Sequence, residues 1–110
     1  MAKIYTHSIP FHVSHRTDRY IACLDGRHIQ SMDDFYDQLQ DALSLPDYFG
    51  RNLDALFDIL SDLSWIEQQF TFLIITNLHE MFAQDSAKRD ALLQLLFEVE
   101  NVDLEIFLFD

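Results

Sequence analysis

The chain of 110 residues contains only one cysteine, Cys23, and only two glycines, Gly26 and Gly50. A single cysteine cannot form an intramolecular disulfide bond. Two isolated glycines cannot build the glycine-rich loop with which nucleotide-binding proteins hold phosphate groups. The scarcity of these two residues therefore excludes a disulfide-stapled scaffold and argues against a nucleotide-binding enzyme.

Basic residues are also scarce, because 7 Lys and Arg face 19 Asp and Glu, giving a net charge of −12. Such a chain is repelled by phosphate backbones and anionic lipids, so we expect it to bind neither nucleic acid nor membrane, and we expect a cationic protein as its partner. The imbalance is local: residues 30–67 hold nine acids and only Arg51, whereas residues 1–29 have a net charge of +2. The strongest negative field is therefore expected in the middle of the chain.

Long apolar runs are missing as well, since no segment approaches the 18 apolar residues of a membrane-spanning helix. The first residues also lack the apolar stretch that follows the positive charge of a secretory signal. We therefore expect a cytoplasmic protein. Apolar residues make up 49% of the chain, which at this length suffices for a single domain with its own core.

The order of the predicted elements indicates an α/β fold. Three apolar runs predict strands: a buried strand at residues 20–24, a second at 70–75 and a last one at 104–109. The continuous apolarity of residues 70–75 fits a strand covered on both faces, as in a parallel sheet. Apolar residues at helical spacing predict three helices, at about residues 31–43, 53–63 and 86–99. The order β-α-α-β-α-β with right-handed crossovers predicts a small parallel sheet of about three strands packed with helices.

Local signals refine this prediction. Ser31 and Asn52 are expected to cap the first two helices, and Gly50 is expected to adopt a backbone conformation that other residues resist. Cys23 lies between apolar neighbours in the first strand, so we expect a buried, inert thiol. Before residue 20 the sequence leaves open whether short strands or an arm form, although Pro10 disfavours a helix there.

The most informative segment is residues 44–60, a loop with two aromatic residues that leads into a helix. Asp54, Asp58 and Asp62 recur at every fourth position of this helix and therefore share one face. Like charges at that spacing repel each other by a few tenths of a kcal/mol per pair. The row of acids therefore indicates a surface shaped to meet positive charge.

Residues 45–58 read Leu-Pro-Asp-Tyr-Phe-Gly-Arg-Asn-Leu-Asp-Ala-Leu-Phe-Asp. This stretch resembles the motif Leu-Pro-x-Tyr-Tyr-Gly-x-Asn-Leu-Asp-Ala-Leu-Trp-Asp of the barstar family, intracellular protein inhibitors of the bacterial ribonuclease barnase. Because the resemblance extends to the order of the elements, we expect residues 20–110 to form a barstar-like domain and residues 1–19 to form an N-terminal extension, as an extra strand or an arm. Phe49 and Phe57 depart from the motif, because each keeps an aromatic ring but loses a hydrogen-bonding tip.

The resemblance implies a non-enzymatic inhibitor that plugs the active site of a basic ribonuclease with the acidic helix and its preceding loop. Asp58 would stand in for a substrate phosphate, and Asp54 would make a second charged contact. The full set of partner-binding positions implied by the resemblance is Tyr48, Phe49, Gly50, Asn52, Leu53, Asp54, Ala55, Asp58 and Glu98.

Most of these residues also have a purely structural interpretation. Asp54, Asp58 and Glu98 could be solvated helix residues, and Tyr48 or Phe49 could pack in the core. Asn52 could be only a helix cap. The spacing of Phe57 with Leu53 and Leu60 favours core packing over partner binding.

Two alternative functions stay open. The chain could be an immunity or regulatory protein with the barstar fold that binds a different basic partner. In another class, Asp54 and Asp58 could hold Mg²⁺ in an enzyme, although Arg51 is the only base near enough to hold a phosphorylated substrate. His12 and His15 lack further ligands, so we expect neither a metal site nor a cofactor.

Overall fold

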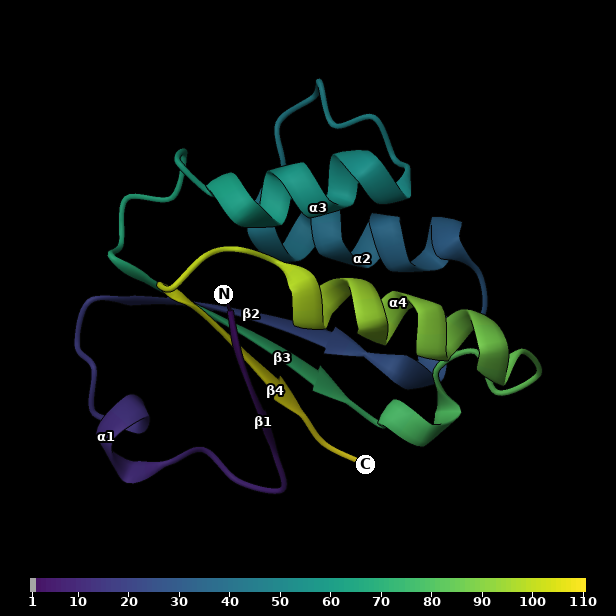
Figure 1. Cartoon of the computed structure of the whole chain (residues 1–110), viewed down its shortest axis with the longest axis horizontal. Helices are drawn as coiled ribbons and strands as arrows, with labels where there is room; N and C mark the ends of the chain where they lie inside the picture. Colours follow the sequence, from purple (N-terminus) through teal and green to yellow (C-terminus); the bar gives the residue numbers. More distant parts are fainter. Residues whose placement is uncertain (1) are drawn as a thin grey trace.

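A computed structural model describes residues 2–110 of the chain. Its four strands form one sheet with the order β1-β4-β3-β2, and every pairing in it is parallel (Figure 1). The elements are β1 (Lys3–Thr6), α1 (Phe11–Ser14), β2 (Arg19–Asp25), η1 (Gly26–His28), α2 (Met32–Leu43), α3 (Leu53–Asp62), β3 (Phe70–Thr76), η2 (Leu78–Glu80), α4 (Ser86–Glu98) and β4 (Leu104–Leu108). The α/β architecture predicted from the sequence is confirmed. No helix among residues 2–110 has the length and apolarity needed to cross a bilayer.

The number of strands differs from the prediction of about three. The additional strand is β1, which lies at the edge of the sheet and pairs with β4 so that Lys3 lies opposite Glu105. It has only four residues, and its two middle residues are only half-buried. Because its partner is at the other end of the chain, no local apolar pattern identifies it.

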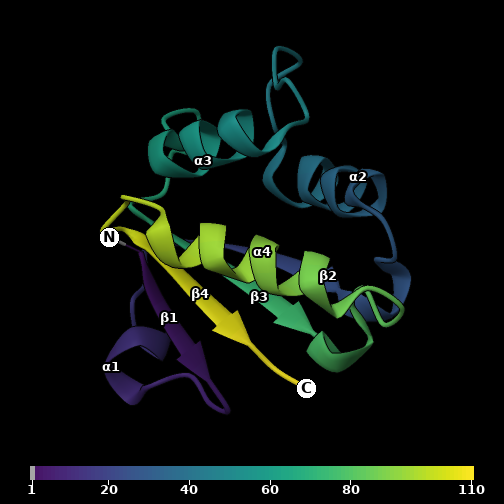
Figure 2. The same ribbon diagram turned by 45° about the vertical axis from the view of Figure 1, so that its right-hand side comes forward.

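The two faces of the sheet are covered unequally. Helices α2, α3 and α4 lie over one face, and the short α1 lies under the other (Figures 1 and 2). Alternate residues of β3 serve the two sides, with Leu73 in the large core and Phe72 in a small cluster with Val13 and Phe107. The continuous apolar runs in the sequence arise because the central strands are buried on both faces.

Two expectations about the first 25 residues are wrong. Phe11–Ser14 forms a helical turn although Pro10 precedes it, because a proline at the start of a helix removes no hydrogen bond that the helix needs. Cys23 is exposed rather than buried. It lies on edge strand β2, on the face that α1 covers only in part, and Ile21 on the same face is also 48% exposed.

Beneath α1, the N-terminal segment supplies the counter-charge for a buried acid. Glu105 on β4 is fully buried, and Arg16 Nη1 lies 2.8 Å from its Oε1. The Arg16 guanidinium also lies 4.4 Å from the centroid of the Phe70 ring. Glu105 Oε2 has no hydrogen-bond partner among the described residues, so the ion pair with Arg16 is the one described ion pair of this buried carboxylate.

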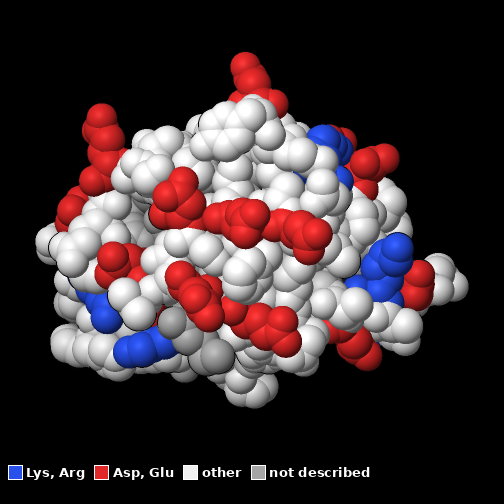
Figure 3. All heavy atoms as spheres, turned by 45° about the horizontal axis from the view of Figure 1, so that its top comes forward, with Lys and Arg blue, Asp and Glu red and all other residues white. Residues whose placement is uncertain are grey.

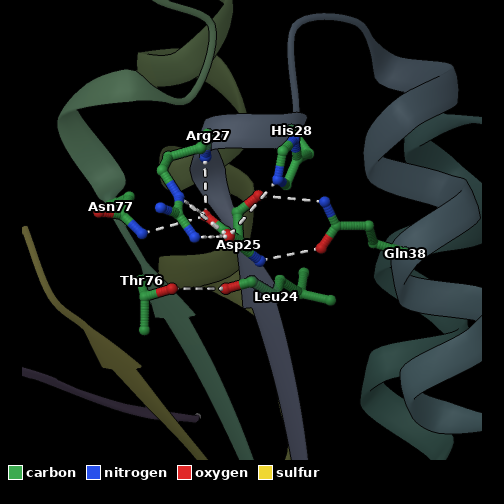
Figure 4. A network of polar contacts seen from close by, with 7 residues as sticks. All are labelled: Leu24, Asp25, Arg27, His28, Gln38, Thr76 and Asn77. Carbon is green, nitrogen blue, oxygen red and sulfur yellow. Dashed lines mark hydrogen bonds and ion pairs between the residues drawn. The ribbon is translucent and has the colours of Figure 1, made fainter.

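A polar network ties the carboxyl ends of β2 and β3 to α2 (Figure 4). The backbone N–H of Asp25 donates to Gln38 Oε1 at 2.9 Å, and Gln38 Nε2 donates to the Asp25 carbonyl at 3.0 Å. The Asp25 carboxylate accepts from Arg27 Nη2 at 2.8 Å and from Asn77 Nδ2 at 3.0 Å. The hydrogen bonds from Arg27 hold the pKa of the Asp25 carboxyl well below its usual range.

We expect Asp25→Asn to lower stability at neutral pH by an amount that shrinks in acid. The folded-state pKa of Asp25 is below its unfolded value, so its contribution is complete above the unfolded value of about 3.9 and is lost as the pH falls through the folded-state value. Urea midpoints of parent and variant should differ at neutral pH and converge as the pH falls from about 5 toward 1. The control is Asp41→Asn, at an exposed aspartate without a described hydrogen bond. An equal difference at every pH for Asp25→Asn would contradict the expectation.

Candidate partner-binding site

The acidic helix predicted from the sequence is α3. Asn52 caps it, since its side-chain oxygen accepts from the Ala55 N–H at 2.8 Å, which confirms the predicted cap. The row of Asp54, Asp58 and Asp62 is exposed. Within residues 2–110, no Lys, Arg or His side chain forms an ion pair with any of the three. The helix therefore presents three uncompensated carboxylates to solvent.

Further acid lies beside this row. Helices α3 and α4 pack against each other, and Glu98 at the end of α4 is exposed, with one oxygen accepting from Gln94 at 3.1 Å. Figure 3 shows a row of acidic side chains across the face formed by these helices, more acid beside it, and Lys and Arg only toward the margins of the view. We call the surface formed by Asp54, Asp58, Asp62 and Glu98 the acidic face.

The two aromatic residues of the preceding loop differ in burial. Tyr48 is 77% exposed, whereas Phe49 is 7% exposed and packs edge-on against Tyr36, with their ring centroids 5.5 Å apart. Leu53, the first residue of α3, is 47% exposed. Tyr48 and Leu53 are therefore free to act as apolar contacts, while Phe49 belongs mainly to the core.

A groove of about 320 Å³ runs between this loop and α3. Its lining consists of Tyr48, Phe49, Gly50, Ala55, Asp58, Ile59 and Asp62. Sequence reasoning placed five of these residues in the site and left out Ile59 and Asp62. The four-residue spacing from Ala55 to Ile59 and from Asp58 to Asp62 is the signal that could have added them.

The backbone of the loop corrects the expectation about Gly50. Within the described chain no glycine has a positive φ, and the residue in the left-handed region is Arg51, at φ 51°. A Cβ at Gly50 would instead lie 3.3 Å from Asn52 Nδ2, so the position is tight for reasons of space. Arg51 has its side chain on α2, where its Nη2 lies 2.9 Å from Asp37 Oδ1.

Phe57 is half-buried and packs against the large core, as its helical spacing favours. The histidines at 12 and 15 are exposed on the opposite side of the sheet. Among residues 2–110 no group of three or more His, Cys, Asp or Glu side chains has an arrangement that could hold a metal ion. The geometry thus brings together acid, exposed aliphatic and aromatic surface, and a groove, which together suit a protein contact.

Comparison with known proteins points in the same direction. The family described as Barstar (barnase inhibitor) matches residues 20–108 of the chain. A Bacillus subtilis (strain 168) protein named "Putative ribonuclease inhibitor YrdF" is 41% identical over 51 residues. That match covers 46% of this chain and 54% of the relative, so the chain spans about half of the relative's length.

Proposed function

Since the chain belongs to the barstar family, we propose that it inhibits a basic ribonuclease in the cytoplasm by covering the enzyme's active site. The observation that carries this proposal is the acidic face, where exposed carboxylates that have no basic partner among residues 2–110 lie beside a groove lined in part by the exposed Tyr48. The name of the Bacillus subtilis relative, "Putative ribonuclease inhibitor YrdF", supports the same function.

Inhibition requires no chemistry from the chain. A ribonuclease active site binds phosphate with cationic side chains, and carboxylates can occupy that place through charge-assisted, bidentate hydrogen bonds. Asp58 lies at the rim of the groove between the loop and α3, so it is the carboxylate we assign to the active site. Asp54 and Glu98 would bind cations beside it, and Tyr48 and Leu53 would supply apolar contact. Gly50, Asn52 and Ala55 would shape the groove and the helix start, with Phe49 beneath them.

The proposal is tested by assaying a panel of basic bacterial ribonucleases, barnase among them, for RNA cleavage in the presence of increasing amounts of the chain. We expect at least one enzyme to be inhibited with a one-to-one end point. If every enzyme cleaves RNA at its original rate, the proposal fails and a different basic partner becomes the better interpretation. A titration with Mg²⁺ separates the enzyme alternative, which requires binding at Asp54 and Asp58.

We expect association with the ribonuclease to slow steeply as salt is added. The net charge of −8 within residues 30–67 attracts a cationic partner, and salt shortens the reach of that field to about 8 Å at physiological ionic strength. Stopped-flow association rates between about 10 and 500 mM salt provide the measurement. An association rate that does not change over this range would show that the acidic face plays no part in the encounter.

A further inference from the structure

Arg51 is the only base within residues 30–67, yet its side chain does not join the acidic face. It reaches back to α2, where Nη2 donates to the Asp33 carbonyl at 3.2 Å and to Asp37 Oδ1 at 2.9 Å. Nη1 donates to Gln40 Oε1. All the hydrogen bonds of this guanidinium therefore join the loop before α3 to a neighbouring helix.

An aromatic contact extends this anchor to the middle of the loop. The Arg51 guanidinium carbon lies 5.5 Å from the centroid of the Tyr36 ring on α2. Tyr36 also contacts Phe49, with the ring planes at 77°. The same α2 side chain thus meets the loop at two residues, and between them lies only Gly50.

The backbone at Arg51 requires such an anchor. Its φ of 51° lies in the left-handed region, which a residue with a long side chain seldom adopts unless surrounding contacts impose it. The next residue is Asn52, the cap of α3, and Tyr48 lies three residues before Arg51. The conformation at Arg51 therefore fixes the direction in which Tyr48 and the first turn of α3 face solvent.

From these contacts we propose that Arg51 is a positioning residue, which holds residues 48–52 and the start of α3 in the partner-binding arrangement by clamping them to α2. This inference rests on the proposed function, because it assigns Arg51 a role at the same surface. The clamp also pairs the Arg51 guanidinium with the carboxylates of Asp33 and Asp37, 3.5 and 2.9 Å away. Asp54, Asp58 and Asp62 therefore have no described cation beside them.

The sign of the effect separates positioning from simple electrostatics. If Arg51 acted only through its charge, removing it from a surface that meets a cationic partner would strengthen binding. If it positions the loop, its removal lets the loop leave the bound arrangement, and the complex dissociates faster.

The test measures dissociation from barnase for the parent chain and for Arg51→Asn. Asparagine tolerates the left-handed backbone but is too short to reach α2, so the variant removes the clamp and keeps the turn. We expect dissociation about tenfold faster. The matched control is Lys88→Gln on α4. Lys88 and Arg51 both line a second hollow, separate from the groove at Asp58, and among the described residues the Lys88 side chain forms no ion pair with residues 48–52. It should leave the dissociation rate unchanged or lower it.

A second measurement needs no partner. Amide hydrogen exchange of the free chain should be faster at residues 48–52 of Arg51→Asn, with the Phe49 N–H, 3.0 Å from the Pro46 carbonyl, as the main reporter. Exchange within α4 should stay unchanged. Arg51→Lys keeps the charge but loses the planar fork of donors, so it should lie between parent and Arg51→Asn in both measurements.

Unchanged or slower dissociation of Arg51→Asn would overturn the inference, as would unchanged exchange in the loop. If the parent chain fails to bind barnase, the same measurement is made with the ribonuclease of the panel that it inhibits. If it inhibits none, that result counts against the proposed function, and the exchange measurement alone then decides whether Arg51 positions the loop. If Arg51→Asn fails to fold, the dissociation rate and the hydrogen exchange are both measured on Arg51→Lys instead.

Discussion

Replacing Arg16 with methionine is expected to lower the free energy of unfolding by about 3 kcal/mol. The change leaves the fully buried Glu105 carboxylate without its only cationic partner among residues 2–110, which is 2.8 Å away in the parent chain. Removal of one member of a buried ion pair is far more costly than removal of both, because the remaining charge has lost its solvation and its partner. Methionine keeps an unbranched side chain over the Phe70 ring, so the loss reports mainly on charge.

The double variant Arg16→Met with Glu105→Leu provides the control, because it replaces both charges with apolar side chains of similar size. Its free energy of unfolding should return to within about 1 kcal/mol of the value for the parent chain. Equilibrium urea melts of the parent and the single and double variants, monitored by the fluorescence of Trp65, give all three values. A midpoint for Arg16→Met equal to that of the parent would show that water, rather than Arg16, compensates Glu105.

The second large effect concerns binding. We expect Asp58→Ala to weaken the complex with the inhibited ribonuclease by about 2–5 kcal/mol, the cost of truncating one partner of a buried charge pair in protein complexes, barnase–barstar among them. Part of this loss is the penalty on a ribonuclease cation that is left buried without its partner. The helix should persist, since alanine has a higher helix propensity than aspartate.

Isothermal titration of parent and variant measures this difference directly. Asp41→Ala is the matched control, because it removes an exposed acid from α2 at a position away from the groove lining. It should change the affinity by no more than the 0.5 kcal/mol or so that an exposed charge contributes. If Asp58→Ala weakens binding by no more than about 0.5 kcal/mol, Asp58 does not lie at the centre of the site.

The sequence predicts the row of Asp54, Asp58 and Asp62 well because its determinants are local, whereas the place of Glu98 beside this row depends on the packing of α3 against α4. Helix α3 is defined by the cap at Asn52 and by apolar residues at helical spacing, and the row from Asp54 to Asp62 follows from helical geometry alone. The same reasoning placed Tyr48 and Phe49 together in a loop. It could not distinguish their burial, because that depends on Tyr36 from another helix.

Features that depend on distant parts of the chain were not predictable in this way. Strand β1 and the ion pair of Arg16 with Glu105 both join the first residues of the chain to the last strand. The exposure of Cys23 follows from the place of β2 at the sheet edge, which the strand's own residues do not reveal. The presence of Gly50 predicts an unusual backbone conformation at residue 50, but that conformation occurs one residue later. Side-chain contacts of Arg51 hold the left-handed backbone at residue 51.

The pairing of β1 with β4 also determines when, during synthesis of the chain, the sheet can be completed. On the ribosome the residues of β1 are made before those of the other described strands and must wait for Leu104–Leu108, because their only described strand partner is β4. At synthesis rates of about 5–20 residues per second this wait lasts several seconds, and all-parallel pairings between distant segments then form slowly. The sheet is therefore completed only once β4 has formed, and of the described strands β1 spends the longest time without a strand partner.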